Sequence, residues 1–267
     1  QAKTLFPYTT LFRSELADVL IPGALRTQWT GPTALNATAT RPTSATSAHF
    51  VVPTMGAALP VNTLIYVSGC AVAANNGLKV VSGSPSTTTI PVSGGLTAET
   101  FTAPQNVTIE VCGFQFASGD ATIDETAGVY TFGCTAKDAT ELGLVKGQPI
   151  FIGDSSAAAY AFATAADYGP AIVTSTPTAT GFTFASTFST FVDDAGTSKT
   201  IRLFFGQTCR TVARTSGDYV ESYYQVETSV ENLGSANATQ YLYAENAAIN
   251  TLTMAFPAAA LATLAAD

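Results

Sequence analysis

The chain has 267 residues, of which 46% are hydrophobic and only 11% are charged, and its formal net charge is −8. Disordered proteins combine low hydrophobicity with high charge density, and coiled coils need dense charged heptads, so the composition excludes both classes. An acidic chain repels phosphate, which argues against nucleic-acid binding through a basic patch. The length corresponds to one to three domains, each large enough to bury a core.

The N-terminus contains an unusual peptide followed by a predicted helix. Residues 4–14 read TLFPYTTLFRS, which resembles the translated read-through of a sequencing adaptor, so we expect residues 1–14 to be non-native. From Glu15 to Leu25, leucine and valine recur on one helical face, although Pro22 weakens the last turn.

From about residue 60 onward, apolar and polar residues alternate with the period of β-strands. Clusters of Gly, Pro, Asn and Asp separate these runs at intervals of about 8–12 residues, which is typical of a β-sandwich or small barrel. In this part of the chain a helix is predicted only from Ser235 to Glu245, where Ser235 can serve as the N-cap.

An internal repeat organises the middle of the chain. LPVNTLIYVSGCAVAANNGLKVVSG (Leu59–Gly83) parallels LGLVKGQPIFIGD and AADYGPAIVTS (within Leu142–Ser175). In each copy an apolar strand ends at a glycine, an Ala-rich loop reaches a second glycine, and further strands follow, the last ending in VCGFQ or LFFGQ. The repeat predicts two tandem β-domains and two flanking segments, at residues 50–116, 117–206, 15–49 and 207–267.

Few residues could carry catalysis. His49 is the single histidine and no G-x-S-x-G elbow is present, so a structural role is favoured over a catalytic one. Two carboxylates could serve a glycosidase, but the candidates lie in Gly-rich turns, where acidic side chains cap the turn. These candidates are Asp120, Asp124, Glu125, Asp193 and Asp194. We therefore expect no enzyme activity, no cofactor and no metal.

The four cysteines form no C-x-x-C pair, which gives zinc and redox functions little support. Free thiols are favoured, while two disulfides in a secreted protein remain the alternative. The cysteines are Cys70, Cys112, Cys134 and Cys209. No apolar run reaches the length of a membrane span.

A long alternating segment, YVESYYQVETSV (Tyr219–Val230), predicts a strand with one polar, acidic face. Glu221, Gln225 and Glu227 fall on that face, and an ordinary solvated surface is the simpler interpretation. Nearby tyrosines could form a stacking platform for sugars or bases, but core or interface packing is favoured. They are Tyr219, Tyr223, Tyr224, Tyr241 and Tyr243.

The order of several motifs resembles that of the bacteriophage tail tube protein family. No single motif is specific, but their order is, and it covers roughly residues 15–260. The motifs are DVLIPGALRTQW (Asp18–Trp29), VSGCAVAANNGLKVV (Val67–Val81), GFQ (Gly113–Gln115), LGLVKGQPIFIGD (Leu142–Asp154), AFATAADYGPAIV (Ala161–Val173), AGTSKTIRLFFG (Ala195–Gly206) and the segment Val226–Phe256.

Some positions depart from the family pattern. Thr228 replaces the basic residue that usually follows the acidic Glu227, and Glu245 with Asn246 stands where the family has a glycine. The family's first strands are missing where residues 1–14 stand, and Asp267 ends the chain short of the family's final strand. We therefore expect the sequence to be a gene fragment.

The resemblance implies a mainly β fold, with a tail-tube-like β-sandwich or barrel, one or two short helices, and two inserted small β-barrel-like domains. It implies that six copies close into a ring and that rings stack into a tube through which the phage genome passes. The implied partners are further copies of the chain and the tail sheath, tape measure and tail terminator proteins. The protein would be made in the host cytoplasm and reside in the virion, without a membrane.

DNA has to slide through such a tube without specific binding, and an acidic lumen repels phosphates. Glu221, Gln225 and Glu227 are therefore our candidates for lumen-facing residues. The alternative function is a secreted or surface carbohydrate-binding or adhesin module. Its support is the Thr/Ser richness, the low charge, the N-x-T sequons and the tandem β-domains.

Overall fold

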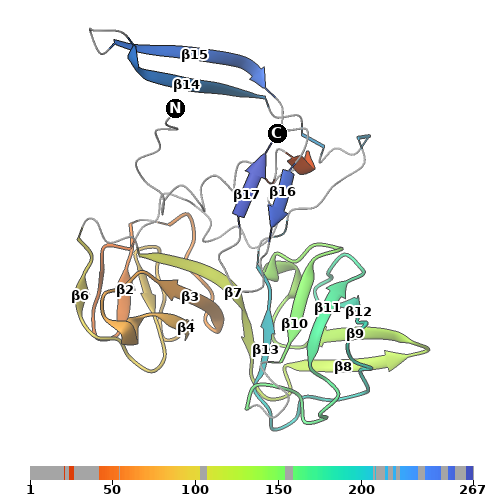
Figure 1. The fold of residues 1–267 in the computed structure, drawn as a ribbon. Helices are drawn as coiled ribbons and strands as arrows, with labels where there is room; N and C mark the ends of the chain where they lie inside the picture. The colour runs from red at the N-terminus through yellow and green to blue at the C-terminus, as the bar shows by residue number, and fades with distance from the viewer. Residues whose placement is uncertain are drawn as a thin grey trace. The chain divides into compact units, whose positions relative to one another are not determined.

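A computed structural model of the chain shows a mainly β protein, with seventeen strands among the residues that it describes (Figure 1). The described residues are 21, 24–26, 42–53, 55–102, 107–153, 159–206, 208, 214–215, 219–220, 223–233, 238–247, 252–255 and 263–266. The mainly β class predicted from the sequence is confirmed.

The chain divides into two compact units, one formed by residues 1–29 with 209–267 and the other by residues 30–208. The second unit contains two separate hydrophobic cores. We call the chain around them the first lobe (residues 42–112) and the second lobe (residues 113–206).

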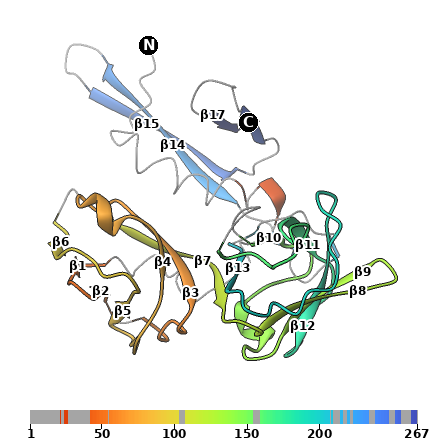
Figure 2. The same ribbon diagram turned by 90° about the horizontal axis from the view of Figure 1, so that it is seen from below.

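The first lobe packs two layers of strands around an aliphatic core that includes Ile65, Val67 and Ile90, with Phe50 as its fully buried aromatic residue. One layer is a four-stranded sheet in the order β5-β2-β1-β6, and the other contains β4, β3 and part of β7. Figure 2 shows β1, β2 and β5 on one side of this lobe and β3 and β4 on the other. The elements are β1 (Ser44–Ala45), β2 (His49–Val51), β3 (Thr63–Ser68), η2 (Ala73–Asn75), β4 (Gly77–Val80), β5 (Thr89–Pro91), β6 (Glu99–Thr100) and β7 (Thr108–Phe116).

The second lobe buries an aromatic core. Phe132 stacks on Phe182 at 5.3 Å and lies 5.4 Å from Phe116, measured between ring centroids. Phe184 and Phe191 meet edge to face at 4.9 Å. The elements are β8 (Ala121–Thr126), β9 (Val129–Cys134), η3 (Ala139–Leu142), β10 (Pro149–Ile152), β11 (Gly169–Val173), β12 (Gly181–Ala185) and β13 (Ile201–Phe204).

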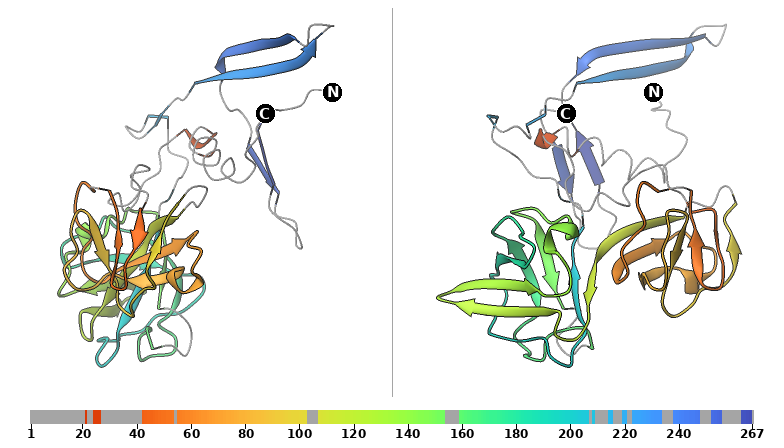
Figure 3. Two further views of the ribbon diagram at one scale, coloured as in Figure 1. Left: turned by 90° about the vertical axis from the view of Figure 1, so that its left-hand side faces the viewer. Right: turned by 180° about the vertical axis from the view of Figure 1, so that it is seen from behind.

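Strands β7 and β13 join the lobes into one nine-stranded sheet, in the order β4-β3-β7-β13-β10-β11-β12-β9-β8. They run side by side, antiparallel, as the right panel of Figure 3 shows, and pair Phe116 with Ile201. Gly113 allows this close approach, because a Cβ there would collide with the carbonyl oxygen of Leu203 and its φ is +157°. The glycine of the GFQ motif is therefore a packing requirement.

The repeat seen in the sequence has the same strand pairing in both lobes. In the first lobe β3 lies between β4 and β7, and in the second lobe β10 lies between β11 and β13. The next strand of each lobe, β5 in the first and β12 in the second, also has a corresponding neighbour. Val81 and Val92 form a bridge at the ends of β4 and β5, and β11 pairs with β12. The copies therefore meet through their last strands, β7 and β13.

The first lobe begins before residue 50, the boundary that the repeat predicts. Strand β1 and residue His49 of β2 precede that boundary, and Ala45 and Phe50 are buried in the lobe's core. Strands of two or three residues are too short for alternation to reveal them.

The second predicted helix, Ser235 to Glu245, is wrong. Its described part belongs to strand β15 (Ala238–Ala247), which pairs with β14 (Tyr224–Leu233) in a hairpin. The cross-strand partner overrides a helical pattern of only about three turns. A further hairpin pairs β16 (Leu252–Ala255) with β17 (Thr263–Ala266).

Most of the predicted helix from Glu15 to Leu25 lies outside the described residues. Ile21, Ala24 and Leu25 are helical. The carbonyl of Arg26 then accepts a hydrogen bond from the N–H of Val220 at 2.9 Å, so the N-terminal and C-terminal segments meet within their unit.

Candidate functional site

The three candidate lumen residues lie at the start of the β14–β15 hairpin or just before it. Glu221 is outside the described residues, whereas Gln225 and Glu227 lie in β14. The register shifts between Tyr224 and Val226, on either side of Gln225, because Tyr224 pairs with Ala247 and Val226 with Ala244. The extra residue of this irregularity lies in β15, which spans three steps where β14 spans two, so the two-residue spacing of Gln225 and Glu227 along β14 is kept.

The β14–β15 hairpin is long for an isolated pair of strands. Each strand has ten residues, and within the described part of the chain their sheet contains these two strands alone. A two-stranded sheet is marginally stable by itself, and its outer edges offer unpaired backbone groups to another chain. The predicted strand Tyr219–Val230 is observed from Tyr224 to Leu233, while Tyr219, Val220 and Tyr223 lie outside it.

The tyrosines do not all share one element. Tyr224 lies in β14, and Tyr241 and Tyr243 lie in β15, paired with Ser229 and Glu227. Tyr223 is 59% exposed before β14 begins. Three of these tyrosines therefore belong to the β14–β15 hairpin, and Tyr223 precedes it.

Asp193 and Asp194 protect a sheet edge. Strand β8 is the last strand of the nine-stranded sheet, and Ile123 on it exchanges two backbone hydrogen bonds with Asp194, at 2.8 and 3.0 Å. The Oδ1 atom of Asp193 accepts a further bond from the N–H of Glu125 at 2.6 Å. The segment around Asp194 therefore occupies backbone groups that would otherwise be open to another strand.

The other carboxylate candidates close turns. Glu125 accepts the N–H of Gly128 at 2.6 Å across the β8–β9 turn, and Asp124 accepts the hydroxyl of Thr126 at 2.9 Å. Asp120 contributes its backbone, donating to Ala117 at 3.1 Å. These bonds correspond to the turn-capping role that the sequence favoured over a catalytic pair.

A buried carboxylate that sequence reasoning missed is Asp167, which is fully buried in the second lobe. Burial raises its pKa to about 6 and the nearby Asp194 and Asp193 add to the rise, against the opposing effect of its hydrogen bond from Val192. Burial opposes ionisation of Asp194 too, but N–H donors from Thr164 and Gly196 outweigh it and lower its pKa. The pKa values of Asp167 and Asp194 are therefore shifted in opposite directions.

His49 and the cysteines show structural roles. The backbone of His49 closes a turn with Thr46, whose hydroxyl accepts the His49 N–H at 3.1 Å. Cys70, Cys112 and Cys134 are free thiols, and burial raises their pKa values to about 11, 11 and 12. They stay protonated and unreactive at neutral pH. Cys209 lies outside the described residues.

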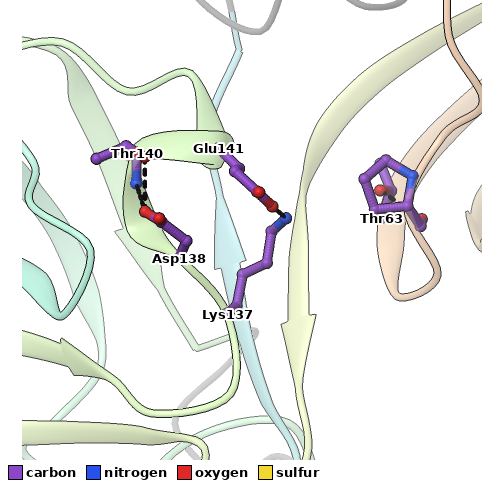
Figure 4. Close-up of polar contacts among 6 residues, drawn as sticks. Thr63, Lys137, Asp138, Thr140 and Glu141 are labelled. Carbon is purple, nitrogen blue, oxygen red and sulfur yellow. Dashed lines mark hydrogen bonds and ion pairs between the residues drawn. The ribbon is translucent and has the colours of Figure 1, made fainter.

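A cleft of about 50 Å³ lies between the lobes' strands, lined by Leu59, Thr63 and Phe114 among others. Lys137 and Glu141, which also line it, form an ion pair (Figure 4). Beside them in the chain, Thr140 donates its N–H and hydroxyl to Asp138 at 2.8 and 2.6 Å, and these bonds lower the pKa of Asp138. Ligand pockets typically enclose about 300 to 1,000 Å³, so this cleft is too small for one.

The outward side of four strands in the second lobe is largely apolar, with Arg202 of β13 and Thr183 of β12 as its polar members. Cross-strand register aligns the apolar residues in two rows, one across β13, β10 and β11 and the next across β10, β11 and β12. Ile172, at the centre of the second row, is 52% exposed. We call this surface the outer apolar face: Phe204, Phe151 and Pro170 in one row, and Pro149, Ile172 and Ala185 in the other.

The corresponding outward positions of the first lobe mix polar and apolar residues. On β3, Tyr66 is also 52% exposed, but it lies between Leu78 of β4 and Glu110 of β7. The next outward residue, Ser68, shares a hydrogen bond of 2.7 Å with Thr108. Exposed apolar patches mark contact surfaces more often than mixed polar ones do, so the second lobe presents the stronger candidate.

No family model, no curated protein and no solved structure matches the chain. Among the described residues, no group of His, Cys, Asp and Glu side chains could hold a metal ion. No helix in the same part of the chain is long and apolar enough to cross a membrane.

Proposed function

We propose that this protein is a structural subunit of a bacteriophage tail tube, in which rings of six copies stack around a channel for the genome. The β14–β15 hairpin carries the proposal, because its ten-residue strands form a sheet of only two strands among the described residues. Adding a strand from a neighbouring copy would satisfy its outer backbone groups. The order of the tail-tube-like motifs supports the same function.

The outer apolar face supplies a second contact in this proposal. The six residues of this face include no charged side chain, and Ile172 at its centre is exposed. Such a surface is favourable where two proteins meet, since charged residues are depleted at interface centres. The chain's net charge of −8 makes copies repel one another, so a face without carboxylates is suited to a contact between them. Partners in the tail would be the sheath, tape measure and tail terminator proteins.

Negative-stain electron microscopy and sedimentation velocity of the purified full chain test the proposal. Rings or tubes with six-fold symmetry are the expected result. Monomers at every concentration would contradict it, and glycan binding by such monomers would favour a carbohydrate-binding or adhesin module instead.

A matched pair of variants tests the outer apolar face. Ile172→Lys should weaken assembly about tenfold, which is about 1.4 kcal/mol, because a residue at the centre of an interface can contribute at least that much and the lysine charge would lose its water. Tyr66→Lys, at an equally exposed position of the first lobe, should leave assembly unchanged. Sedimentation at several concentrations measures both, and equal effects would remove this face from the proposed contacts.

The acidic lumen is tested by charge reversal. In assembled tubes, Glu227→Lys combined with Glu221→Lys would add a ring of cations and retain duplex DNA, which the parent tubes should not. Co-sedimentation with DNA, and its loss as salt is raised, is the measurement. Glu110→Lys combined with Glu141→Lys, on β7 and η3, is the control with the same charge change. Tubes of the double variant that bind no more DNA than this control would place Glu221 and Glu227 away from the lumen.

A further inference from the structure

The internal repeat places two buried polar residues at the same position in the two lobes. Asn75 lies two residues before Gly77, which opens β4, and Asp167 lies two residues before Gly169, which opens β11. Both side chains are fully buried. An amide in one lobe therefore corresponds to a carboxyl in the other.

Asn75 uses both of its side-chain polar atoms to bind one distant residue. Its Oδ1 accepts the N–H of Thr97 at 2.9 Å, and its Nδ2 donates to the carbonyl of Thr97 at 2.9 Å. The Nδ2 also donates to Glu99 at 2.9 Å. This two-bond bridge fastens the loop before β4 to the segment before β6.

Asp167 makes only half of the corresponding bridge. Its Oδ1 accepts the N–H of Val192 at 2.8 Å, whereas its Oδ2 is buried and has no hydrogen-bond partner among the described residues. The charged groups that act on it are Asp193 and Asp194, from the same segment as Val192. Both are acidic, so an ionised Asp167 adds a like charge to a buried site.

A second link joins the same two segments and does not depend on Asp167. The Oδ2 of Asp194 accepts the N–H of Thr164 at 2.9 Å, and its Oδ1 accepts the N–H of Gly196 at 2.8 Å. The donors around Asp194 keep it ionised, and a second ionised carboxyl next to it is unfavourable. The unpaired Oδ2 of Asp167 is the atom on which a proton would be retained.

We propose that Asp167 is a proton-dependent latch between the loop that precedes β11 and the segment around Val192. When protonated, its Oδ2–H donates to a backbone carbonyl of that segment, as the Nδ2 of Asn75 does to Thr97. When ionised, the side chain keeps the single bond from Val192 and the latch weakens. The proton comes from solvent and returns to it, so mild acid tightens the second lobe and leaves the first lobe unchanged.

The protonated and ionised states of the Asp167 carboxyl determine how the stability of the latch depends on pH. Folding raises the pKa of Asp167 from its ordinary value of 3.8 to about 6. The stability of the latch is therefore complete below about pH 4, falls as the pH rises toward 6, and is constant above that range. Between pH 5 and pH 7.5 the linkage predicts about a tenfold loss of protection against opening.

Hydrogen exchange of the unassembled full chain at pH 5 and pH 7.5, corrected for intrinsic exchange rates, tests the latch. Peptides covering residues 186–196 should lose about tenfold in protection at the higher pH, while peptides covering 87–99 of the first lobe should not. Asp167→Asn gives the second lobe the amide that Asn75 supplies in the first lobe. This variant should show no such pH dependence, and its protection at pH 7.5 should exceed that of the parent. Asp124→Asn removes an exposed charge and should behave as the parent.

Two results would overturn the proposal. One is a parent protein whose peptides 186–196 show the same protection at both pH values. The other is an Asp167→Asn variant that is less protected than the parent at pH 7.5. Asp167→Ala provides an independent check, since it should be poorly protected at both pH values; protection that still rose at pH 5 would assign the proton to another group.

Discussion

The two lobes share a strand order but differ in what they bury and in what they expose. The first lobe has an aliphatic core and presents Tyr66 beside Glu110 on its outward face, whereas the second has a core of stacked phenylalanines and an apolar outward face. Strand pairing follows the backbone, which the repeat preserves. The side chains on the two faces of the sheet can differ between the copies of the repeat. One copy can therefore present a mixed polar surface while the other presents an apolar surface suited to binding another chain.

The same contrast extends to the buried polar groups. Asn75 satisfies its amide fully, whereas Asp167 leaves one oxygen without a partner. Because an amide carries no charge, the first lobe should be indifferent to mild changes in pH. The carboxyl makes the second lobe responsive, at a cost in stability near neutral pH.

The largest expected effect comes from the aromatic core. Phe132→Ala should destabilise the second lobe by about 4 to 5 kcal/mol, because it leaves a cavity and removes ring contacts with Phe116 and Phe182. Phe50→Ala, which removes an equally buried ring from the aliphatic core, should cost about 3 kcal/mol. Urea titration measures the free energy of unfolding of both variants. Equal losses would show that ring stacking adds nothing beyond buried apolar area.

The β content and the repeat could be predicted because alternation and glycine spacing are local signals. Gly69 and Gly153, and then Gly77 and Gly169, mark the copies in the sequence, and the strands between them follow. The helix predicted over Ser235 to Glu245 failed because the pairing of β15 with β14 is a tertiary effect that a short pattern cannot report.

The buried carboxyl at Asp167 was missed because its partner, Val192, lies 25 residues away. No motif marks such a contact. Aligning the two copies by their glycines would have paired Asp167 with Asn75, and that exchange of amide for acid was the one available signal. Conversely, the edge-protecting role of Asp193 and Asp194 depends on the position of β8 at the end of the sheet, which turn chemistry alone does not reveal.

The difference between the lobes can also be tested by giving the first lobe the buried carboxyl that the second lobe has. Asn75→Asp removes the two bonds that Nδ2 donates and places a carboxyl beside Glu99, so we expect a loss of about 2 to 4 kcal/mol at neutral pH. Burial and the Glu99 charge should raise the pKa of the new carboxyl, so the loss should shrink as the pH falls toward 5. Urea titrations at both pH values measure it, with Asn62→Asp, at a partly buried position of the same lobe, as the control. A pH-independent loss would mean that the bridge to Thr97, rather than the charge, distinguishes the lobes.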